Sequence, residues 1–386
     1  MTQTSEPGTP GQKERPARLE RLKNLLRFDP ANEQLARECV SLALEAGDYD
    51  FVLARSAEVL HQSPGNTQAQ FDRASALIGK RDYPAAIEAL QALVAQSPDI
   101  TAAQVNLGLC YYAIGEYAQA RAPLDLAFAA GERSPGTLRL LVSTYHHLGL
   151  IEEAVAIADS NPPPSQCGAA LPGVYALLYI DAEQPLPAAR YAAQALAANP
   201  DSVDGLVARA TLDAVRLRVE PARERYSRAL ELAPATGRAW IGLGSLALLS
   251  RDFATARKQI ERGLETLPNH TGSWLLLAWV HIVAGDIEQA EQTLHHTLEL
   301  DRNFAEARGA LAAVLALRGD RAGAEREIEV ARRLDPDGLS VHVARSVLMA
   351  RGGDSVAARK IIDDALAALT SGDGAISSAL KRATRH

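Results

Sequence analysis

The feature that most constrains this chain is a 34-residue period that runs through nearly its whole length. Prolines recur at this spacing, with no insertion between them, at Pro30, Pro64, Pro98, Pro200, Pro234, Pro268 and Pro336. Such a period indicates a stack of small structural units, because each unit of this size buries its apolar face only against its neighbours. The 386 residues therefore favour one extended array over two or three compact domains.

When the recurring proline is numbered 32, ten units of 34 residues follow one another. They span 33–66, 67–100, 101–134, 135–168, 169–202, 203–236, 237–270, 271–304, 305–338 and 339–372. Position 20 is alanine in nine of the ten units, although only 71 of the 386 residues are alanine. Position 8 is also small in most units. Small side chains at fixed positions let two helix backbones approach closely, so each unit is predicted to contain two packed helices.

The helix ends are also marked within each unit. Glycine stands at position 15 in six units: Gly47, Gly115, Gly149, Gly285, Gly319 and Gly353. A glycine ends a helix in left-handed geometry, and a proline prevents its continuation. The pattern predicts a first helix of about 14 residues, a tight turn, a second helix and a proline stop.

This pattern resembles the tetratricopeptide repeat family over residues 33–372. The best copies read NLGLCYYAIGEYAQA at 106–120 and AWIGLGSLALLSRDFATA at 239–256, with Trp240 and Trp274 at the family's position-4 tryptophan. The resemblance implies an all-α, right-handed α-solenoid of stacked helix-turn-helix hairpins. It also implies that the first helices line a concave face.

The two ends and one internal segment depart from the period. Residues 1–16 are polar and are expected to be disordered. Residues 17–32 are expected to form a capping helix over the first unit, and residues 373–386 a second cap or a tail. Prolines at 162–164 interrupt the pattern, so the irregular segment 161–173 is either a hinge or a stiff loop.

The resemblance places the binding surface at positions 2, 5, 9 and 12 of the first helices. In the middle of the chain these positions carry Val105, Leu109, Tyr112, His146, Leu177, Ile180, Val207, Ile241, Leu248, Leu275, Trp279 and Ile282. A groove lined in this way suits an amphipathic helix or an apolar extended segment, with Tyr112 and Trp279 as anchors. An acidic peptide is expected to fit poorly. The alternative is that many of these side chains pack against the next repeat.

Charge and composition exclude several classes of protein. A formal net charge of -7 gives no electrostatic footprint for DNA or RNA, so no nucleic-acid partner is expected. No apolar stretch is long enough for a membrane span or a secretory signal. Three widely spaced cysteines suit a reducing compartment, and a cytoplasmic location is expected.

No catalytic residue, cofactor site or metal site is assigned from the sequence. His146 and His147 are adjacent, as are His295 and His296, and helical neighbours point in different directions, so neither pair can share a metal. His281 takes position 11, which is tyrosine in other units, and is expected to be a hydrogen-bonded core residue. The chain is therefore not expected to be an enzyme.

The function that these features favour is a protein-protein interaction scaffold or assembly factor that binds a polypeptide segment in an apolar groove. A bacterial secretion, pilus or envelope-polysaccharide system is a suitable setting. Two alternatives stay open: a chaperone-like holder of an export substrate, and a regulatory subunit of an enzyme on another chain. Self-association through an exposed terminal repeat also stays open.

Overall fold

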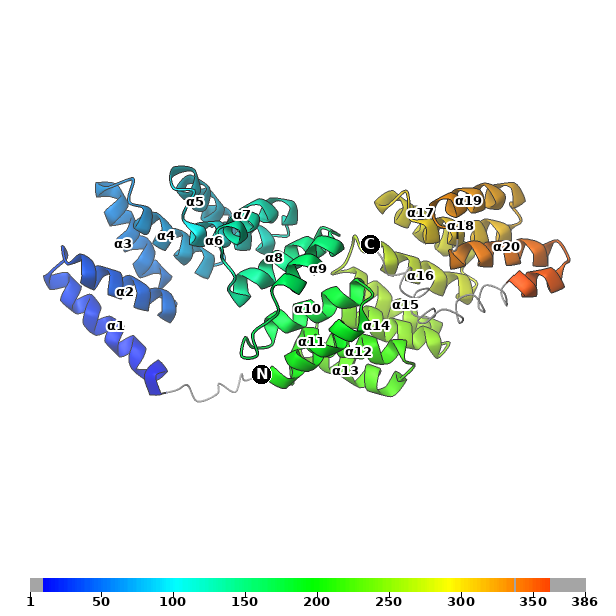
Figure 1. Ribbon diagram of the computed structural model, residues 1–386, viewed down its shortest axis with the longest axis horizontal. Coiled ribbons are helices and arrows are strands. Elements are labelled where there is room, and N and C mark those ends of the chain that lie inside the picture. The colour runs from blue at the N-terminus through cyan, green and yellow to red at the C-terminus, as the bar shows by residue number, and fades with distance from the viewer. Residues whose placement is uncertain (1–9, 337, 362–386) are drawn as a thin grey trace. The chain divides into compact units, whose positions relative to one another are not determined.

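The computed structural model describes residues 10–336 and 338–361, and within these ranges every regular element is an α-helix. The protein is an α-solenoid in which each unit forms two helices joined by a tight turn (Figure 1). The first helices are α2 (Glu33–Ala46), α4 (Thr67–Gly79), α6 (Thr101–Ala113), α8 (Pro135–His147), α10 (Ala170–Asp181), α12 (Val203–Val215), α14 (Gly237–Leu249), α16 (Thr271–Ala284), α18 (Ala305–Arg318) and α20 (Leu339–Arg351). Nine of them begin at the first residue of a sequence unit, and α10 begins one residue later.

The second helices are α3 (Tyr49–Gln62), α5 (Tyr83–Gln96), α7 (Tyr117–Ala129), α9 (Ile151–Ser160), α11 (Pro185–Ala198), α13 (Val219–Leu232), α15 (Phe253–Leu264), α17 (Ile287–Leu300) and α19 (Arg321–Leu334). A further helix begins at Ser355 and is described as far as Ile361. The contacts divide the chain into two compact bodies, residues 1–150 and 151–386. The division falls between the two helices of the fourth unit, ahead of the irregular segment 161–173.

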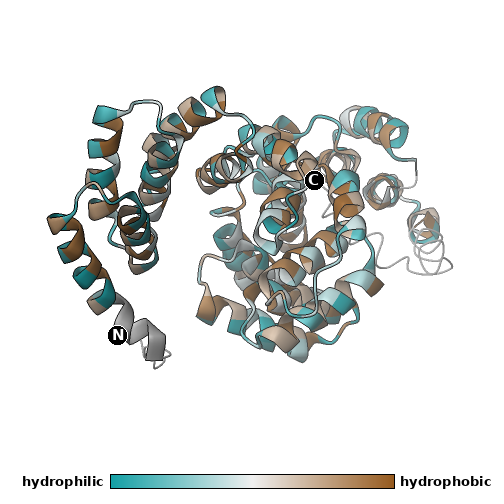
Figure 2. Cartoon of the chain, turned by 60° about the vertical axis from the view of Figure 1, so that its left-hand side comes forward, coloured by the Kyte–Doolittle hydropathy of each residue, from teal (hydrophilic) through white to brown (hydrophobic). Residues whose placement is uncertain are grey.

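Within each body, first helices pack against the second helices that lie beside them in the sequence and against neighbouring first helices. Position 20 lies at the centre of this packing: the alanines there, from Ala86 to Ala324, have no exposed surface. Position 8 needs a small residue because a Cβ on Gly108 would lie 2.5 Å from Leu124 Cγ, and one on Gly244 2.6 Å from Ile260 Cγ1. Apolar and polar stretches alternate along the helices of both bodies (Figure 2).

The N-terminal helix differs from the sequence prediction. Helix α1 spans Pro10–Phe28, so it begins before residue 17, and residues 10–16, which were expected to be disordered, form its first turns. Pro16 lies inside the helix, although the polar composition of residues 1–16 predicts disorder up to this proline. Leu19 is buried against Val40 and Ala43 of the first unit, so α1 covers the open end of this body. Residues 1–9 lie outside the described residues.

The irregular segment in the second body has a definite local structure. Helix α9 has only ten residues because the Asn161 to Pro164 run cannot continue it. The loop is attached to its own body by two bonds: Tyr175 Oη donates to the Asn161 carbonyl at 3.0 Å, and Gln194 Nε2 donates to the Pro164 carbonyl at 3.3 Å. The predicted C-terminal cap at 373–386 lies outside the described residues.

Candidate protein-binding surface

The twelve residues predicted to line the groove divide into ten that are half-buried and two that are buried. Val207 and Leu275 are 3% and 0% exposed, so their assignment to the groove was wrong. Both stand at position 5, and they pack into separate core clusters, Val207 beside Tyr226 and Leu275 beside Leu294. Ile241, also at position 5, lies over Gly263 of α15, where an added Cβ would be 2.6 Å from its Cδ1. Position 5 therefore contributes to the contact between helices in these repeats.

In the first body the predicted residues are Val105, Leu109, Tyr112 and His146, all half-buried. Tyr112 belongs to an aromatic cluster with two neighbours that the prediction did not include. Its hydroxyl lies 3.3 Å from His147 Nε2, and Tyr117 stacks on the His147 ring at a centroid distance of 4.2 Å. The cluster fixes the Tyr112 ring at the end of α6.

In the second body Leu177, Ile180, Leu248, Trp279 and Ile282 are half-buried. Trp279 and Ile282 rest on the core formed by α16, α17 and α18, and Leu248 rests on the core between α15 and α16. These side chains are therefore held in place by packing and still present part of their surface.

The most exposed apolar row on the first helices was missed by the sequence reasoning. Position 13 carries Val215, Leu249, Val283 and Leu317 in four consecutive repeats, and we call these four residues the apolar ladder. Val215 is 37%, Leu249 54% and Val283 48% exposed, and Leu317 is half-buried. Position 13 lies four residues after position 9 and so continues the same helix face. That spacing is the signal that could have found it.

The apolar ladder ends at both sides in charged residues at the same position. In the fifth repeat position 13 is Asp181, whose carboxylate accepts bonds of 3.0 and 2.6 Å from the two terminal nitrogens of Arg238. This bidentate pair joins α10 to α14 across an intervening repeat. In the tenth repeat position 13 is Arg351. The uninterrupted apolar row is therefore limited to α12, α14, α16 and α18, which are labelled in Figure 1.

The turns beside the apolar ladder carry more available positive than negative charge. Arg216, Arg251 and Arg351 are exposed. The acidic residues of these turns are already engaged: Asp252 and Asp320 cap α15 and α19, and Asp286 lies 3.7 Å from Arg257. In these turns the arginines are therefore more available to a partner than the acidic residues are.

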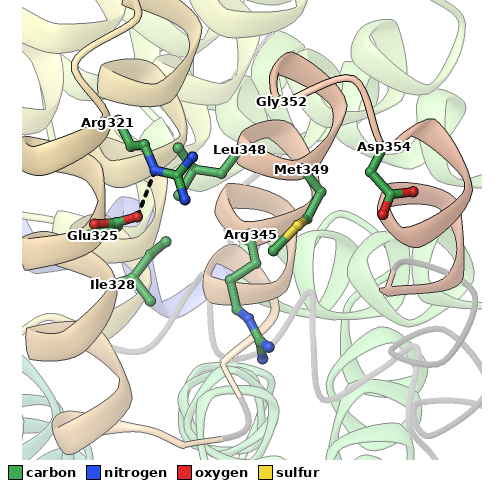
Figure 3. A pocket seen from close by; sticks show the side chains of 8 residues that line it. All are labelled: Arg321, Glu325, Ile328, Arg345, Leu348, Met349, Gly352 and Asp354. Carbon is green, nitrogen blue, oxygen red and sulfur yellow. Dashed lines mark hydrogen bonds and ion pairs between the residues drawn. The ribbon is translucent and has the colours of Figure 1, made fainter.

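A cavity of about 330 Å³ lies between α19 and α20 (Figure 3). Its apolar wall includes Ile328 at position 24 and Leu348 at position 10, and Arg321 and Glu325 form an ion pair of 2.8 Å at its rim. In most of the other repeats these two positions are core, as in Leu294 and Val280, which are 0% and 1% exposed. The cavity is therefore an opened contact between α19 and α20, with an apolar wall and four charged residues, Arg321, Glu325, Arg345 and Asp354, in its lining.

The histidine and cysteine side chains do not form a reactive arrangement in the described residues. His281 is buried as expected, but its Nδ1 makes no hydrogen bond, and the nearest carboxylate oxygen, of Asp286, is 3.8 Å away; the predicted hydrogen bond was wrong at that nitrogen. Burial lowers the pKa of His281 and raises the pKa of Cys110 to about 11. Cys110 therefore remains a thiol at neutral pH, unsuited to nucleophilic chemistry.

These features define a class of protein: a helical-repeat solenoid whose stacked first helices present an extended surface. Family models described as tetratricopeptide repeat match residues 71–135, 208–271 and 247–314. The chain is a tetratricopeptide repeat protein. No helix in the described part of the chain is long and apolar enough to cross a membrane.

Several solved structures are similar to this chain. They include YrrB, described as a TPR protein with an unusual peptide-binding site, at 21% identity over 50% of this chain and 99% of that one, with a TM-score of 0.36. MamA matches at 17% identity over 41% of this chain and 92% of that one, with a TM-score of 0.35. The APC/C hetero-tetramer Cut9-Hcn1 matches at 12% identity over 96% and 93%, with a TM-score of 0.49. No curated protein matches the sequence.

Proposed function

We propose that this protein is a non-catalytic scaffold or assembly factor that holds a polypeptide segment against its first helices. The observation that carries the proposal is the apolar ladder, because a soluble surface rarely leaves an apolar row uncovered across several repeats unless something binds there. Trp279, at position 9 of the same helix as Val283, adds a large, partly exposed ring held by its core contacts. Rigid aromatic groups of this kind are typical anchors of protein interfaces.

The setting we propose is the cytoplasmic side of a bacterial secretion, pilus or envelope-polysaccharide system. An excess of arginine over lysine, 34 to 6, is typical of GC-rich bacterial genomes. The three free cysteines suit a reducing compartment. The acidic net charge supports a protein partner over a nucleic acid.

A capture experiment with matched variants tests this proposal. The test variant is Leu249→Ser with Val283→Ser, which removes two ladder side chains without adding negative charge at a helix C-terminus. The control is Leu186→Ser with Val330→Ser, which changes one exposed leucine and one exposed valine on the second helices α11 and α19. Circular dichroism first shows that both variants are folded.

We expect wild type and control to retain the same partner from native cytosol, and the test variant to lose it. The purified partner should then bind wild type directly with a defined stoichiometry. Equal retention by all three proteins would show that binding lies elsewhere and would exclude the apolar ladder as the site.

A chaperone-like holder of an export substrate is the second candidate, because the apolar ladder contains no polar side chain to select one sequence. A holder would bind several unfolded proteins weakly, whereas a scaffold binds one folded or helical partner at fixed stoichiometry. An enzyme recovered as the single partner would instead indicate a regulatory subunit. The capture experiment separates these roles by the identity and number of the retained proteins.

A further inference from the structure

The inference drawn here rests on the proposed function and concerns the partner's chemistry. We infer that the apolar ladder binds an amphipathic helix of a partner protein whose apolar stripe is bordered by acidic residues. Two features of this surface favour such a partner: the spacing of Val215, Leu249, Val283 and Leu317, and the charges beside them.

The spacing of the apolar ladder favours a helix over an extended strand. Packed helices lie about 8–10 Å apart, so successive ladder residues recur at roughly that interval. A helix presents the same face every seven residues, about 10.5 Å along its axis. An extended strand covers the interval in about three residues and reverses its face each time. Only the helix can meet every ladder residue with the same side.

The length of the partner helix follows from the ends of the apolar ladder. Four ladder residues make three intervals, or about 30 Å, which corresponds to roughly 20 residues of helix. Beyond them the same position holds the Asp181–Arg238 pair at one side and Arg351 at the other. A longer apolar stripe would place apolar side chains against charged groups.

The charges beside the apolar ladder favour acidic rather than basic borders. Arg216 directly follows Val215, Arg251 follows Leu249 by two residues, and Arg351 stands beyond Leu317 in the next repeat. None of the three makes an ion pair within the described part of the chain. Arg218 and Arg318, in contrast, already face Asp213 and Glu291. Three available guanidinium groups along one edge complement carboxylates on the partner helix.

The acidic groups of this edge do not cancel that preference. The carboxylates of Asp252 and Asp320 accept backbone N–H bonds at 3.1 and 2.9 Å from the second helices that they cap. A basic partner would have to compete with these caps and would meet the three arginines as well. The expectation that an acidic peptide fits poorly concerned the apolar face, whereas the borders beside this face suit acidic side chains.

The test uses the full-length protein and two synthetic peptides. Both have about 25 residues with leucine at every seventh position and alanine filling the stripe, and neither contains proline. One carries glutamate at the border positions and the other lysine. Calorimetry measures the dissociation constant of each peptide for wild type, for Arg216→Glu with Arg251→Glu, and for Arg326→Glu. The last changes an exposed arginine on the second helix α19 and serves as the control.

We expect the glutamate peptide to bind wild type and the control with the same dissociation constant. Both proteins should bind it at least about tenfold more tightly than the lysine peptide, because the free energies of a few exposed ion pairs add up to that factor. The double arginine variant should reverse this preference, and raising the salt to about 0.5 M should narrow it. Equal binding of both peptides to wild type would overturn the acidic border but leave the apolar ladder as a binding site. Binding of neither peptide would overturn the helical partner, whereas the scaffold function is decided separately by the capture experiment.

Discussion

Position 15, in the turn after each first helix, adopts the same unusual backbone conformation in all ten repeats. Position 15 has a left-handed φ whether it is glycine, as at Gly285 with φ 85°, or not, as at Leu217 with φ 57°. The other exceptions are Arg81, Glu183 and Arg251. The reason is that the next N–H must reach back to the carbonyl of position 11, as Arg218 N does to Asp213 O at 2.9 Å. The turn thus imposes the geometry even where the side chain opposes it.

Leu217→Gly is expected to stabilise the second body by about 0.5–1 kcal/mol. Left-handed geometry costs an L-residue about 1–2 kcal/mol, and glycine removes this cost. The greater freedom of glycine in the unfolded chain offsets about 0.5–1 kcal/mol of the stabilisation. Leu217 is 64% exposed, so little burial is lost. Urea titration measures the change. Leu217→Ala is the control and should give no gain; equal stabilisation by alanine would show that loss of the exposed leucine, not the backbone, is responsible.

His281 should make the second body sensitive to acid. Position 11 is a tyrosine in three repeats that bonds to position 25 of the preceding one, as Tyr145 does to Asp125 at 2.8 Å. His281 cannot make that bond, and its burial lowers its pKa from 6.5 despite Asp286 and Glu261, while Arg257 lowers it further. Because the folded state holds the neutral form, protons bind the unfolded chain more readily, and stability falls as the pH drops below about 6.5.

His281→Tyr is therefore expected to raise the melting temperature more at pH 5.5 than at pH 8. A tyrosine has no charge to gain at either pH, and its hydroxyl can reach toward Glu261 as Tyr145 reaches Asp125. In the wild type, protonation of His281 in the unfolded chain lowers the free energy of unfolding by at most about 1.4 kcal/mol per pH unit. The variant does not have this loss of stability. Melting curves of both proteins across this range give the answer. An identical pH dependence for the variant would mean that other groups control the acid sensitivity.

Sequence reasoning was effective at residues whose size is fixed by backbone contact. Alanine at position 20 and a small residue at position 8 follow from the close approach of two helices, because such contacts leave little room for a side chain. It failed where the backbone alone sets the outcome: nothing about Arg251 or Leu217 as residue types indicates left-handed geometry. It also failed for Val207 and Leu275, because position 5 can point toward a neighbouring helix or toward the groove.

At the scale of the helix, one bond joins successive repeats through chemically different side chains. In five repeats the side chain at position 4 donates to the carbonyl at position 32 of the preceding repeat. Trp240 Nε1 bonds Pro234 at 2.8 Å, Trp274 Nε1 bonds Pro268 at 2.7 Å, and Gln70 Nε2 bonds Pro64 at 2.9 Å. The bond satisfies a backbone carbonyl in the turn that follows the second helix. It explains why tryptophan, glutamine or, at Arg308, arginine can occupy this position.

Glycine at position 5 allows two first helices to come unusually close. A Cβ on Gly309 would lie 2.6 Å from Ser340 Cβ and 2.8 Å from the Val341 nitrogen. Glu306, one turn earlier, is buried and accepts the N–H groups of Leu339 at 2.9 Å and Ser340 at 3.1 Å. The N-terminus of α20 is thereby held against α18. Helix α20 therefore packs closely against α18, whereas the cavity lies between α20 and α19.

Gly309→Ala should loosen the last repeat, because its methyl group meets backbone atoms that cannot move alone. We expect faster hydrogen exchange in α20 and a loss of about 1–3 kcal/mol, as for other overpacked contacts. Gly136→Ala is the matched control, since a Cβ there has nothing within 4 Å and helix propensity favours alanine. Unchanged exchange in α20 for the Gly309 variant would show that α18 and α20 can separate at little cost.

The elements themselves were largely predictable, because a repeated pattern averages out local ambiguity. Nine first helices start at the residue that opens a unit, whereas the start of α1 was misplaced because no repeat informs it. The cavity beside Ile328 and Leu348 could not be predicted. Those residues are ordinary core types. Their exposure depends on the close contact of α20 with α18 at Gly309, which cannot be read from any single residue.

At the scale of the whole chain, stability should be local. Repeat arrays are stabilised by each unit and its contacts with the next, so distant parts can unfold separately. The contacts here divide into bodies of residues 1–150 and 151–386. All three tryptophans, Trp240, Trp274 and Trp279, lie in the second body. Tryptophan emission therefore reports that body alone, whereas helical circular dichroism reports both.

Two equivalent core substitutions test this independence. Leu90 in α5 and Leu294 in α17 both stand at position 24 and both are 0% exposed, so each change to alanine should cost about 2–5 kcal/mol locally. In urea, Leu294→Ala should shift the tryptophan transition to lower denaturant. Leu90→Ala should leave the tryptophan transition unchanged and shift only the circular dichroism change that comes from the first body. If Leu90→Ala moved the tryptophan transition equally, the two bodies would unfold as one cooperative unit and the stability of the array would not be local.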